Sequence, residues 1–174
     1  LPAPFSLWHP DAMIRTDRLI LRRPTPADLP DIHAVFSDPE TMTYWSGPAH
    51  RSLEETAAWL QPVFDDPEGS RFDTFIEWRG RIVGKLGCWR LPQIGFALHR
   101  DCRGQGIATE ALHGFIAHMR AERVCDHLLA DVDPRNDPSR QLLGRCGFRH
   151  VETVRNTMQT HLGWCDSAYY RLDL

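Results

Sequence analysis

The stretch RDCRGQGIATEAL, residues 100–112, carries two glycines and two arginines between an apolar run and an amphipathic one. The run before it, QIGFAL at 93–98, is short and follows Pro92, as expected of a strand. After the loop, apolar residues recur at helical spacing from Ala108 to Met119. The stretch therefore predicts a strand–loop–helix unit with a glycine loop at the start of its helix.

Such a loop is suited to holding a phosphate or diphosphate. The first turn of a helix leaves its N–H groups without helical partners and carries roughly half a positive charge. Gly104 and Gly106 let an anion approach those groups closely, and Arg103 adds a charge. The alternative is a glycine turn that merely starts a helix. The common nucleotide loops do not fit, because neither G-x-x-x-x-G-K-[ST] nor a complete G-x-G-x-x-G is present.

The rest of the chain predicts a mixed α/β sheet in one domain. A capping box, Ser52 with Glu55, opens one predicted helix, which Pro62 should end early or kink. Arg79 and Gly80 form the predicted turn of a hairpin. The expected strands are 18–23, 71–78, 81–89, 93–98, 127–132 and 167–174. The expected helices start at Thr25 and Ser52 and, further on, cover 107–119 and 137–148.

Composition excludes several classes of protein. The chain has 174 residues, 42% hydrophobic and 25% charged, which is typical of a globular domain. Its net charge of −3 gives no reason to expect nucleic acid or an anionic membrane as a partner, and no apolar run is long enough to span a bilayer. Residues 1–12 are expected to form an extended arm or an expression remnant, with the domain over 13–174.

The cysteines and histidines predict no metal site. Five cysteines occur without a C-x-x-C pair, and the nine histidines show no ligand spacing such as H-E-x-x-H. A disulfide framework is therefore not expected, and a reducing cytoplasm fits this cysteine usage. Cys102 adjoins the glycine loop. An unreactive cysteine is a better interpretation of this position than a reactive thiol. Both a monomer and a homodimer are compatible with the sequence.

The motif Arg103-x-x-Gly106-x-Ala108 resembles the acyl-CoA pyrophosphate signature [Q/R]-x-x-G-x-[G/A] of the GNAT N-acetyltransferases. The segment VDPRNDPSRQLLGRCGF at 132–148 is similar to a later segment of that family, with Asn136, Ser139 and a Gly-Phe pair in place. The stretches at 15–32 and 38–45 resemble the branch that acetylates the N-termini of ribosomal proteins. Together these segments run from about Met13 to the C-terminus.

The resemblance implies a single-domain fold with a central, mostly antiparallel sheet flanked by helices, whose fourth and fifth strands splay apart to admit acetyl-CoA. It implies that the pantetheine arm pairs with the strand at 93–98 and that the diphosphate lies on the glycine loop. Asn136 and Ser139 would line the thioester end, with Arg135 and Arg140 near the 3′-phosphate. The implied cofactor-binding residues are Phe96, Ala97, Leu98, Arg103, Gly104, Gln105, Gly106, Ile107, Ala108, Thr109, Asn136 and Ser139.

Acetyl transfer by direct attack needs a neutral amine, a donor for the carbonyl oxygen and an acid for the leaving thiolate. Ser139 is the candidate acid, against the alternative of a serine that only satisfies backbone at a helix start. Asn136 is a positioning group, and Tyr44 and Trp45, with Trp59, are candidate walls of the acceptor site, against a simple core role. Related enzymes often carry a glutamate where this chain has Gln93, which cannot take a proton.

No base is assigned from the sequence. Glu77, Asp131 and Asp133 lie on strands near the expected cleft, but each is read as a solvated or ion-paired acid, and a water chain would also serve. The acceptor is a protein N-terminus or a small amine. Two other classes stay open: an acyl-CoA-binding sensor of the same fold without turnover, and a nucleotide-binding enzyme that uses the same loop.

Overall fold

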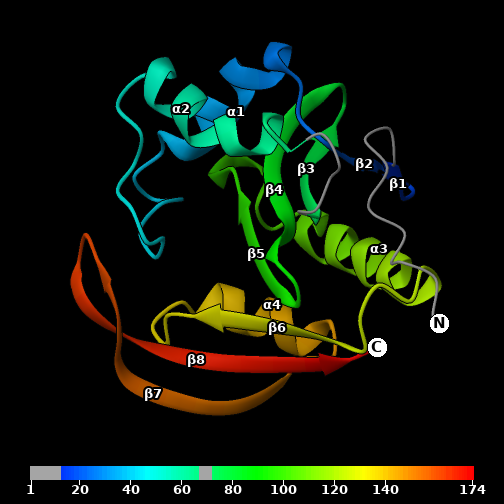
Figure 1. The fold of residues 1–174 in the computed structure, drawn as a ribbon, viewed down its shortest axis with the longest axis vertical. Helices are drawn as coiled ribbons and strands as arrows, with labels where there is room; N and C mark the ends of the chain where they lie inside the picture. Colours follow the sequence, from blue (N-terminus) through cyan, green and yellow to red (C-terminus); the bar gives the residue numbers. More distant parts are fainter. Residues whose placement is uncertain (1–12, 67–71) are drawn as a thin grey trace.

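The computed structural model describes residues 13–66 and 72–174 (Figure 1). The predicted arm at 1–12 and Arg71, the first residue of the predicted hairpin, lie outside these residues. The described strands are β1 (Met13–Arg15), β2 (Leu19–Arg22), β3 (Phe72–Trp78), β4 (Arg81–Arg90), β5 (Gln93–Leu98), β6 (His127–Val132), β7 (Arg149–Thr160) and β8 (Gly163–Asp173). The described helices are η1 (Pro26–Asp28), α1 (Leu29–Phe36), α2 (Leu53–Phe64), η2 (Arg100–Cys102), α3 (Ile107–Ala121) and α4 (Asp137–Arg145).

The strands form one sheet in the order β1-β2-β3-β4-β5-β6-β8-β7. Neighbouring strands run antiparallel, except β5 and β6, which are parallel. The β3–β4 hairpin turns at Arg79 and Gly80, both at positive φ, as the sequence predicted. The prediction of a mixed sheet in a single domain is confirmed.

Helices cover both faces of the sheet because neighbouring residues on each strand point to opposite sides. On β3, Phe75 packs with the residues of α1 and α2 in one core, whereas the adjacent Ile76 packs with α3 in the other. Leu142 and Leu143 bring α4 into the α3 core. The sheet therefore has an α1/α2 face and an α3/α4 face.

Strands β5 and β6 part soon after they meet (Figure 1). Their register contains only two pairs, Gln93 with Leu129 and Ile94 with Ala130. Beyond that point β5 stays paired with β4 as far as Leu98, while β6 stays paired with β8. The splay expected between the fourth and fifth strands is thus confirmed between β5 and β6, since the short additional strand β1 shifts the numbering by one.

The secondary structure differs from the expectation in four places. Strand β7 was not predicted, and β8 begins at Gly163, before the predicted residue 167. Nearly every residue of β7 is exposed, so it lacks the apolar alternation by which strands are recognised. Helix α2 continues through Pro62, which lies close to its exposed end, because Leu60 and Val63 on either side are buried. The short β1 was also missed.

Residues 13–66 and 72–174 contain neither a membrane-spanning helix nor a grouped set of metal ligands. None of the helices there combines the length and the apolarity that crossing a bilayer requires. In the same ranges, no three side chains of His, Cys, Asp or Glu are grouped as a metal ion would need.

A carboxylate ties the start of α3 to the β1–β2 turn. Glu110 accepts hydrogen bonds from the Thr16 hydroxyl at 2.5 Å, the Arg18 backbone N–H at 2.8 Å and the Arg18 Nε at 2.6 Å. Burial acts to raise the pKa of Glu110, but these hydrogen bonds and the Arg18 charge together hold the pKa below its usual value. The first turn of α3 is therefore fixed to residues more than ninety positions earlier in the chain.

We predict that Glu110→Gln lowers the free energy of unfolding by about 1–3 kcal/mol near pH 7, since a half-buried set of charge-assisted bonds loses its anion. Because the folded pKa of Glu110 is depressed, the contribution of its charge is present above roughly pH 4.3 and is lost as the pH falls through the folded value. The difference in the free energy of unfolding between wild type and Glu110→Gln should therefore become smaller at acidic pH. Urea unfolding across pH measures it.

The matched control is Glu122→Gln at the other end of the same helix, where the side chain is exposed. It should change stability little. An unfolding free energy of Glu110→Gln equal to that of wild type at pH 7 would contradict the proposed tie.

Candidate functional site

The divergence of β5 and β6 leaves one edge of β5 open. Within the described residues, positions 95–98 of β5 have no strand paired on the β6 side. A small apolar cavity lies in this opening, lined by Phe96, Ala97, Leu98, Ala108, Leu112 and Leu142 together with Ile76 and Leu86. Three predicted cofactor-binding residues, Phe96, Ala97 and Leu98, therefore lie beside predicted residue Ala108 of α3.

The loop after β5 presents backbone N–H groups at the start of α3. Gly104 and Gly106 adopt left-handed conformations, with φ of 72° and 75°, and Gly106 is the N-cap of α3. In the part of the chain that the structure describes, none of the amides of residues 104–109 donates to a protein acceptor. Ile107 is buried, whereas residues 103–106 are exposed. The site is thus a row of available donors at the positive end of a helix dipole, the arrangement that binds phosphate.

Arg18 lies against this loop, which sequence reasoning missed. Its Nη1 donates to the Gln105 carbonyl at 3.0 Å, and its Nη2 would lie 3.4 Å from a Cβ added at Gly106. The Gln105 side chain donates to the Asp101 carbonyl, which also braces the loop. No local pattern marks Arg18, because its role depends on contacts with residues 87 and 92 positions away.

Arg103 is oriented differently from the expectation. Its guanidinium donates to Glu40 at 2.8 Å and to the Thr41 hydroxyl at 2.9 Å, and its own backbone N–H donates to the Arg100 carbonyl. The Thr41 hydroxyl in turn donates to the buried carboxylate of Asp38. The side chain of Arg103 therefore holds the loop between α1 and α2. The sequence analysis expected this positive charge to lie beside the diphosphate, whereas the guanidinium is bound to Glu40 and Thr41.

Asn136 and Ser139 meet at the start of α4, as predicted. The Asn136 side-chain oxygen accepts the Ser139 backbone N–H at 3.2 Å, so Asn136 is the N-cap of the helix. Among the described residues, the Ser139 hydroxyl has no hydrogen-bond partner. Asn136, and not Ser139, therefore provides the side chain that caps the helix backbone. The Ser139 hydroxyl is left available.

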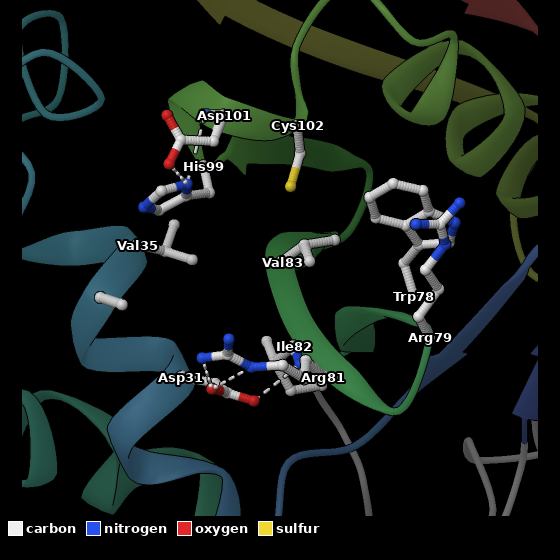
Figure 2. Close-up of a pocket in the computed structure, with 11 residues that line it drawn as sticks. Asp31, Val35, Trp78, Arg79, Arg81, Ile82, Val83, His99, Asp101 and Cys102 are labelled. Atoms are coloured by element: carbon white, nitrogen blue, oxygen red, sulfur yellow. Dashed lines mark hydrogen bonds and ion pairs between the residues drawn. The ribbon is translucent and has the colours of Figure 1, made fainter.

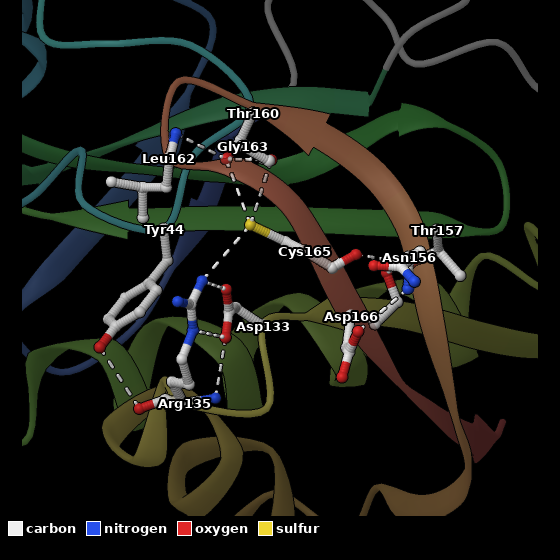
Figure 3. A network of polar contacts seen from close by, with 11 residues as sticks. Tyr44, Asp133, Arg135, Asn156, Thr157, Thr160, Leu162, Gly163, Cys165 and Asp166 are labelled. Atoms are coloured by element: carbon white, nitrogen blue, oxygen red, sulfur yellow. Dashed lines mark hydrogen bonds and ion pairs between the residues drawn. The ribbon is translucent and has the colours of Figure 1, made fainter.

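The aromatic residues predicted for the acceptor site divide into two groups. Trp45 packs edge-on against Phe36, with ring centroids 5.2 Å apart, and Trp59 joins them in the α1/α2 core. Tyr44 is exposed, and its hydroxyl donates to the Arg135 carbonyl at 3.4 Å. Figure 3 shows Tyr44 reaching from the α1–α2 loop across to the loop before α4. Trp45 is therefore mainly a core residue, and Tyr44 alone of the three bridges the two loops.

Two of the three candidate acids are ion-paired. Glu77 binds Arg22 at 2.6 Å. Asp133 binds Arg135 at 2.5 Å, and the Arg135 hydrogen bonds hold the pKa of Asp133 below its usual value. Arg135 also donates to the Cys165 sulfur, as Figure 3 shows. The third acid, Asp131, has no cation among the influences on its pKa in the described residues.

The two arginines expected near a 3′-phosphate are both engaged. Arg135 is held by Asp133, and Arg140 donates to Asp137 at 2.9 Å and to the Tyr170 hydroxyl at 3.2 Å. Each guanidinium is nevertheless exposed on one side.

A second cavity, of about 280 Å³, lies between α1, η2 and the β3–β4 turn (Figure 2). Its rim carries the Asp31–Arg81 ion pair, and Cys102 points into it. Cys102 is 8% exposed, and burial raises the pKa of its thiol. The interpretation of Cys102 as an unreactive neighbour of the loop therefore agrees with its surroundings.

Comparison with known proteins identifies the family. Residues 18–149 match the acetyltransferase (GNAT) domain. The chain belongs to the GNAT acetyltransferase family. Curated relatives of this GNAT chain include the uncharacterized N-acetyltransferase p20 of Bacillus licheniformis, which is 25% identical over 150 residues that cover 81% of this chain and 84% of p20.

Solved structures share the GNAT fold. RimL, a ribosomal L7/L12 α-N-protein acetyltransferase in complex with coenzyme A, superposes with a TM-score of 0.84 at 19% identity, covering 94% of this chain and 98% of RimL. MccE, a microcin C7 self-immunity acetyltransferase in complex with acetyl-CoA and AMP, gives a TM-score of 0.82 at 16% identity, covering 91% and 94%. The family match and the curated relatives make the chain a GNAT N-acetyltransferase. Rim-type ribosomal-protein acetyltransferases, the branch that the sequence resembles, are among the structures that share its fold.

We predict that Arg103→Ala loosens the α1–α2 loop, because Glu40 and Thr41 lose their shared cation. The amides of Met42 and Trp45, which donate within that loop, should exchange with solvent faster. Hydrogen–deuterium exchange measured by mass spectrometry tests this. Arg149→Ala, which removes an exposed arginine paired with Asp173 elsewhere, should leave residues 38–45 unaffected. Unchanged exchange in the Arg103 variant would show that the contact does not hold the loop.

Proposed function

We propose that the chain transfers the acetyl group of acetyl-CoA to a primary amine, either a protein N-terminus or a small-molecule amine, by direct attack in a ternary complex. The observation that carries this proposal is the row of available amides at 104–109, which opens beside the unpaired edge of β5. A long ligand with a diphosphate at one end and an extended amide-containing arm fits both features. The complexes of RimL with coenzyme A and of MccE with acetyl-CoA support it.

The diphosphate rests on the amides of residues 104–109, with Gly104 and Gly106 giving it room. Arg18, on the other side of the loop, adds positive charge close to Gly106. The pantetheine arm adds to the open edge of β5 at Phe96, Ala97 and Leu98, as a further strand would. Arg103 contributes through the loop it holds and not through a direct bond to phosphate.

The acetyl thioester then lies where β5 and β6 part. A backbone N–H of residues 96–98 is placed to stabilise the carbonyl oxygen as it gains charge. The Ser139 hydroxyl at the start of α4 protonates the departing thiolate, whose pKa in solution is about 8.5. Asn136 positions Ser139, because its side-chain oxygen already caps the helix. Tyr44 lies at the entrance for the acceptor amine.

A screen for thiol release tests the proposal. The purified chain is incubated with acetyl-CoA and a panel of peptides with free N-termini and small amines, and the product is identified by mass spectrometry. Saturable release with at least one amine is expected. Tight binding of CoA without release for any amine would instead favour the sensor, and stabilisation by ATP–Mg²⁺ greater than that by CoA would favour a nucleotide enzyme.

We also propose that the enzyme acts in the cytoplasm, since its five cysteines are all free and four of them are buried.

The glycine loop gives a prediction for affinity. Gly106→Ala should weaken CoA binding about tenfold or more, measured by calorimetry, because the added Cβ would press on Arg18 Nη2 at 3.4 Å and disturb the loop that holds the diphosphate. The left-handed backbone also costs an alanine about 1–2 kcal/mol. Gly80→Ala is the matched control: it has the same φ of 75° but lies in the β3–β4 turn with nothing within 4 Å. A similar loss of affinity in both variants would remove the loop from the binding site.

For Ser139→Ala we expect kcat to fall about ten- to a hundredfold while the KM for acetyl-CoA stays within about twofold. The melting temperature should not change, because Asn136 rather than the Ser139 hydroxyl caps α4. Steady-state kinetics with a saturating acceptor measure the effect. Full turnover in the variant would end the assignment of Ser139 as the acid.

A further inference from the structure

One carboxylate of β6 lies where the strands part. Ala130 is the last β6 residue that pairs with β5, and Asp131, the next residue, pairs only with Tyr169 of β8. Ala130 is 2% exposed in the α3/α4 core, so Asp131 belongs to the opposite, α1/α2 face. Gln93 of β5 is on that face too, because its neighbour Ile94 is in the α3/α4 core. Asp131 therefore stands at the mouth of the opening, one residue beyond the last β5–β6 pair and on the same face of the sheet as Gln93, whose own partner is Leu129.

Three other acids of the sheet are neutralised by cations, whereas Glu152 of β7 and Asp166 of β8 form no ion pair among the described residues. Glu77 is paired with Arg22 and Asp133 with Arg135. Asp73 is paired with Lys85 at 2.5 Å, with both side chains 5% exposed. A carboxylate bound to a cation is a poor proton acceptor, because protonation breaks the ion pair. Over the described residues, no ion pair involves Asp131, which is exposed.

The surroundings of Asp131 favour the uptake of a proton. Burial raises the pKa of its carboxyl, and a hydrogen bond from the Ser167 hydroxyl opposes that shift only in part. Ser167 is 2% exposed and accepts the Thr157 hydroxyl at 2.7 Å, which leaves its own proton to be directed at Asp131. The Thr157 hydroxyl thus occupies the Ser167 oxygen, and the Ser167 hydroxyl is the polar neighbour that lowers the pKa of Asp131.

We propose that Asp131 is the general base of this enzyme and takes the proton that the acceptor amine loses when it attacks the acetyl carbonyl. The inference rests on the proposed function, since it names a group for the same reaction. Gln93 cannot fill this role, and Asp131 reaches the same opening from the neighbouring strand.

The step balances with the groups already named. The neutral amine nitrogen bonds to the acetyl carbon, and its N–H proton passes to an oxygen of Asp131. The carbon–sulfur bond then breaks, and the thiolate takes the proton of Ser139, which is restored from solvent. The amide and the free thiol leave, and Asp131 returns its proton to water. No oxidant, reductant or metal takes part.

The first experiment compares Asp131→Asn with wild type on whichever amine gives thiol release. Loss of a general base typically costs about 10²–10⁴-fold, so kcat should fall by at least a hundredfold with the acceptor saturating. The affinity for CoA, measured by calorimetry, should stay within about twofold, and the melting temperature should be unchanged, since asparagine can still accept the Ser167 hydrogen bond. Asp126→Asn, an exposed aspartate just before the other end of β6, is the matched control and should keep wild-type turnover.

Chemical rescue separates proton transfer from a structural role. Asp131→Ala should be as slow as Asp131→Asn, and added formate should restore turnover of the alanine variant in proportion to its concentration. Formate should not accelerate wild type or Asp126→Asn. Lack of rescue, a loss of kcat below about threefold in Asp131→Asn, or a loss explained by weaker CoA binding would each overturn the assignment.

The two levels of the proposal fail differently. An active wild type with an equally active Asp131→Asn overturns this inference and leaves the acetyltransferase reaction standing. A wild type that binds CoA but releases no thiol with any amine overturns the proposed function, and the base with it.

Discussion

The brevity of the β5–β6 pairing is the constraint on which the site depends. Two parallel registers join the strands, after which β5 follows β4 and β6 follows β8. A fully paired sheet would leave the end of β5 without an open edge. Because the strands part, the end of β5, the glycine loop and the starts of α3 and α4 all border one opening. The groups proposed for catalysis and cofactor binding therefore surround the place where β5 and β6 no longer hydrogen-bond to each other.

The electrostatics of the opening come mainly from the backbone. Arg18, Arg103 and Arg135 lie nearby, but each is bound to a carboxylate, Glu110, Glu40 and Asp133 respectively. These ion pairs hold the surrounding loops in place. The Arg103–Glu40 pair, whose two side chains are both exposed, adds little stability by itself. The net charge of −3 agrees with such pairing. The attraction for an anion therefore rests on the oriented amides of residues 104–109, whose dipoles need no counter-charge.

The sequence was most informative where local geometry decides the structure. The glycine loop, the Asn136 segment and the β3–β4 turn each carry their signal within a few residues, and the structure has all three. Contacts between residues far apart in the sequence left no such signal. Nothing near Arg18 indicates that it braces the glycine loop, and nothing near Arg103 indicates that it binds Glu40. Strand β7 was not predicted, for a different reason. A strand exposed along its length has no buried face, so its apolar pattern is absent.

The tie between Glu110 and the Thr16–Arg18 turn also bears on how far the diphosphate motif can be regarded as a module. The motif recognised at 103–108 is local, yet the guanidinium that braces the Gln105 carbonyl comes from the first hairpin of the chain. A peptide that spans only β5, the loop and α3 would lack that brace. Transplanting the loop into another scaffold would require the N-terminal hairpin to go with it. A chimera that takes residues 93–121 from a homologue should fold well only if the residues at Glu110 and at Thr16–Arg18 come from the same protein or match.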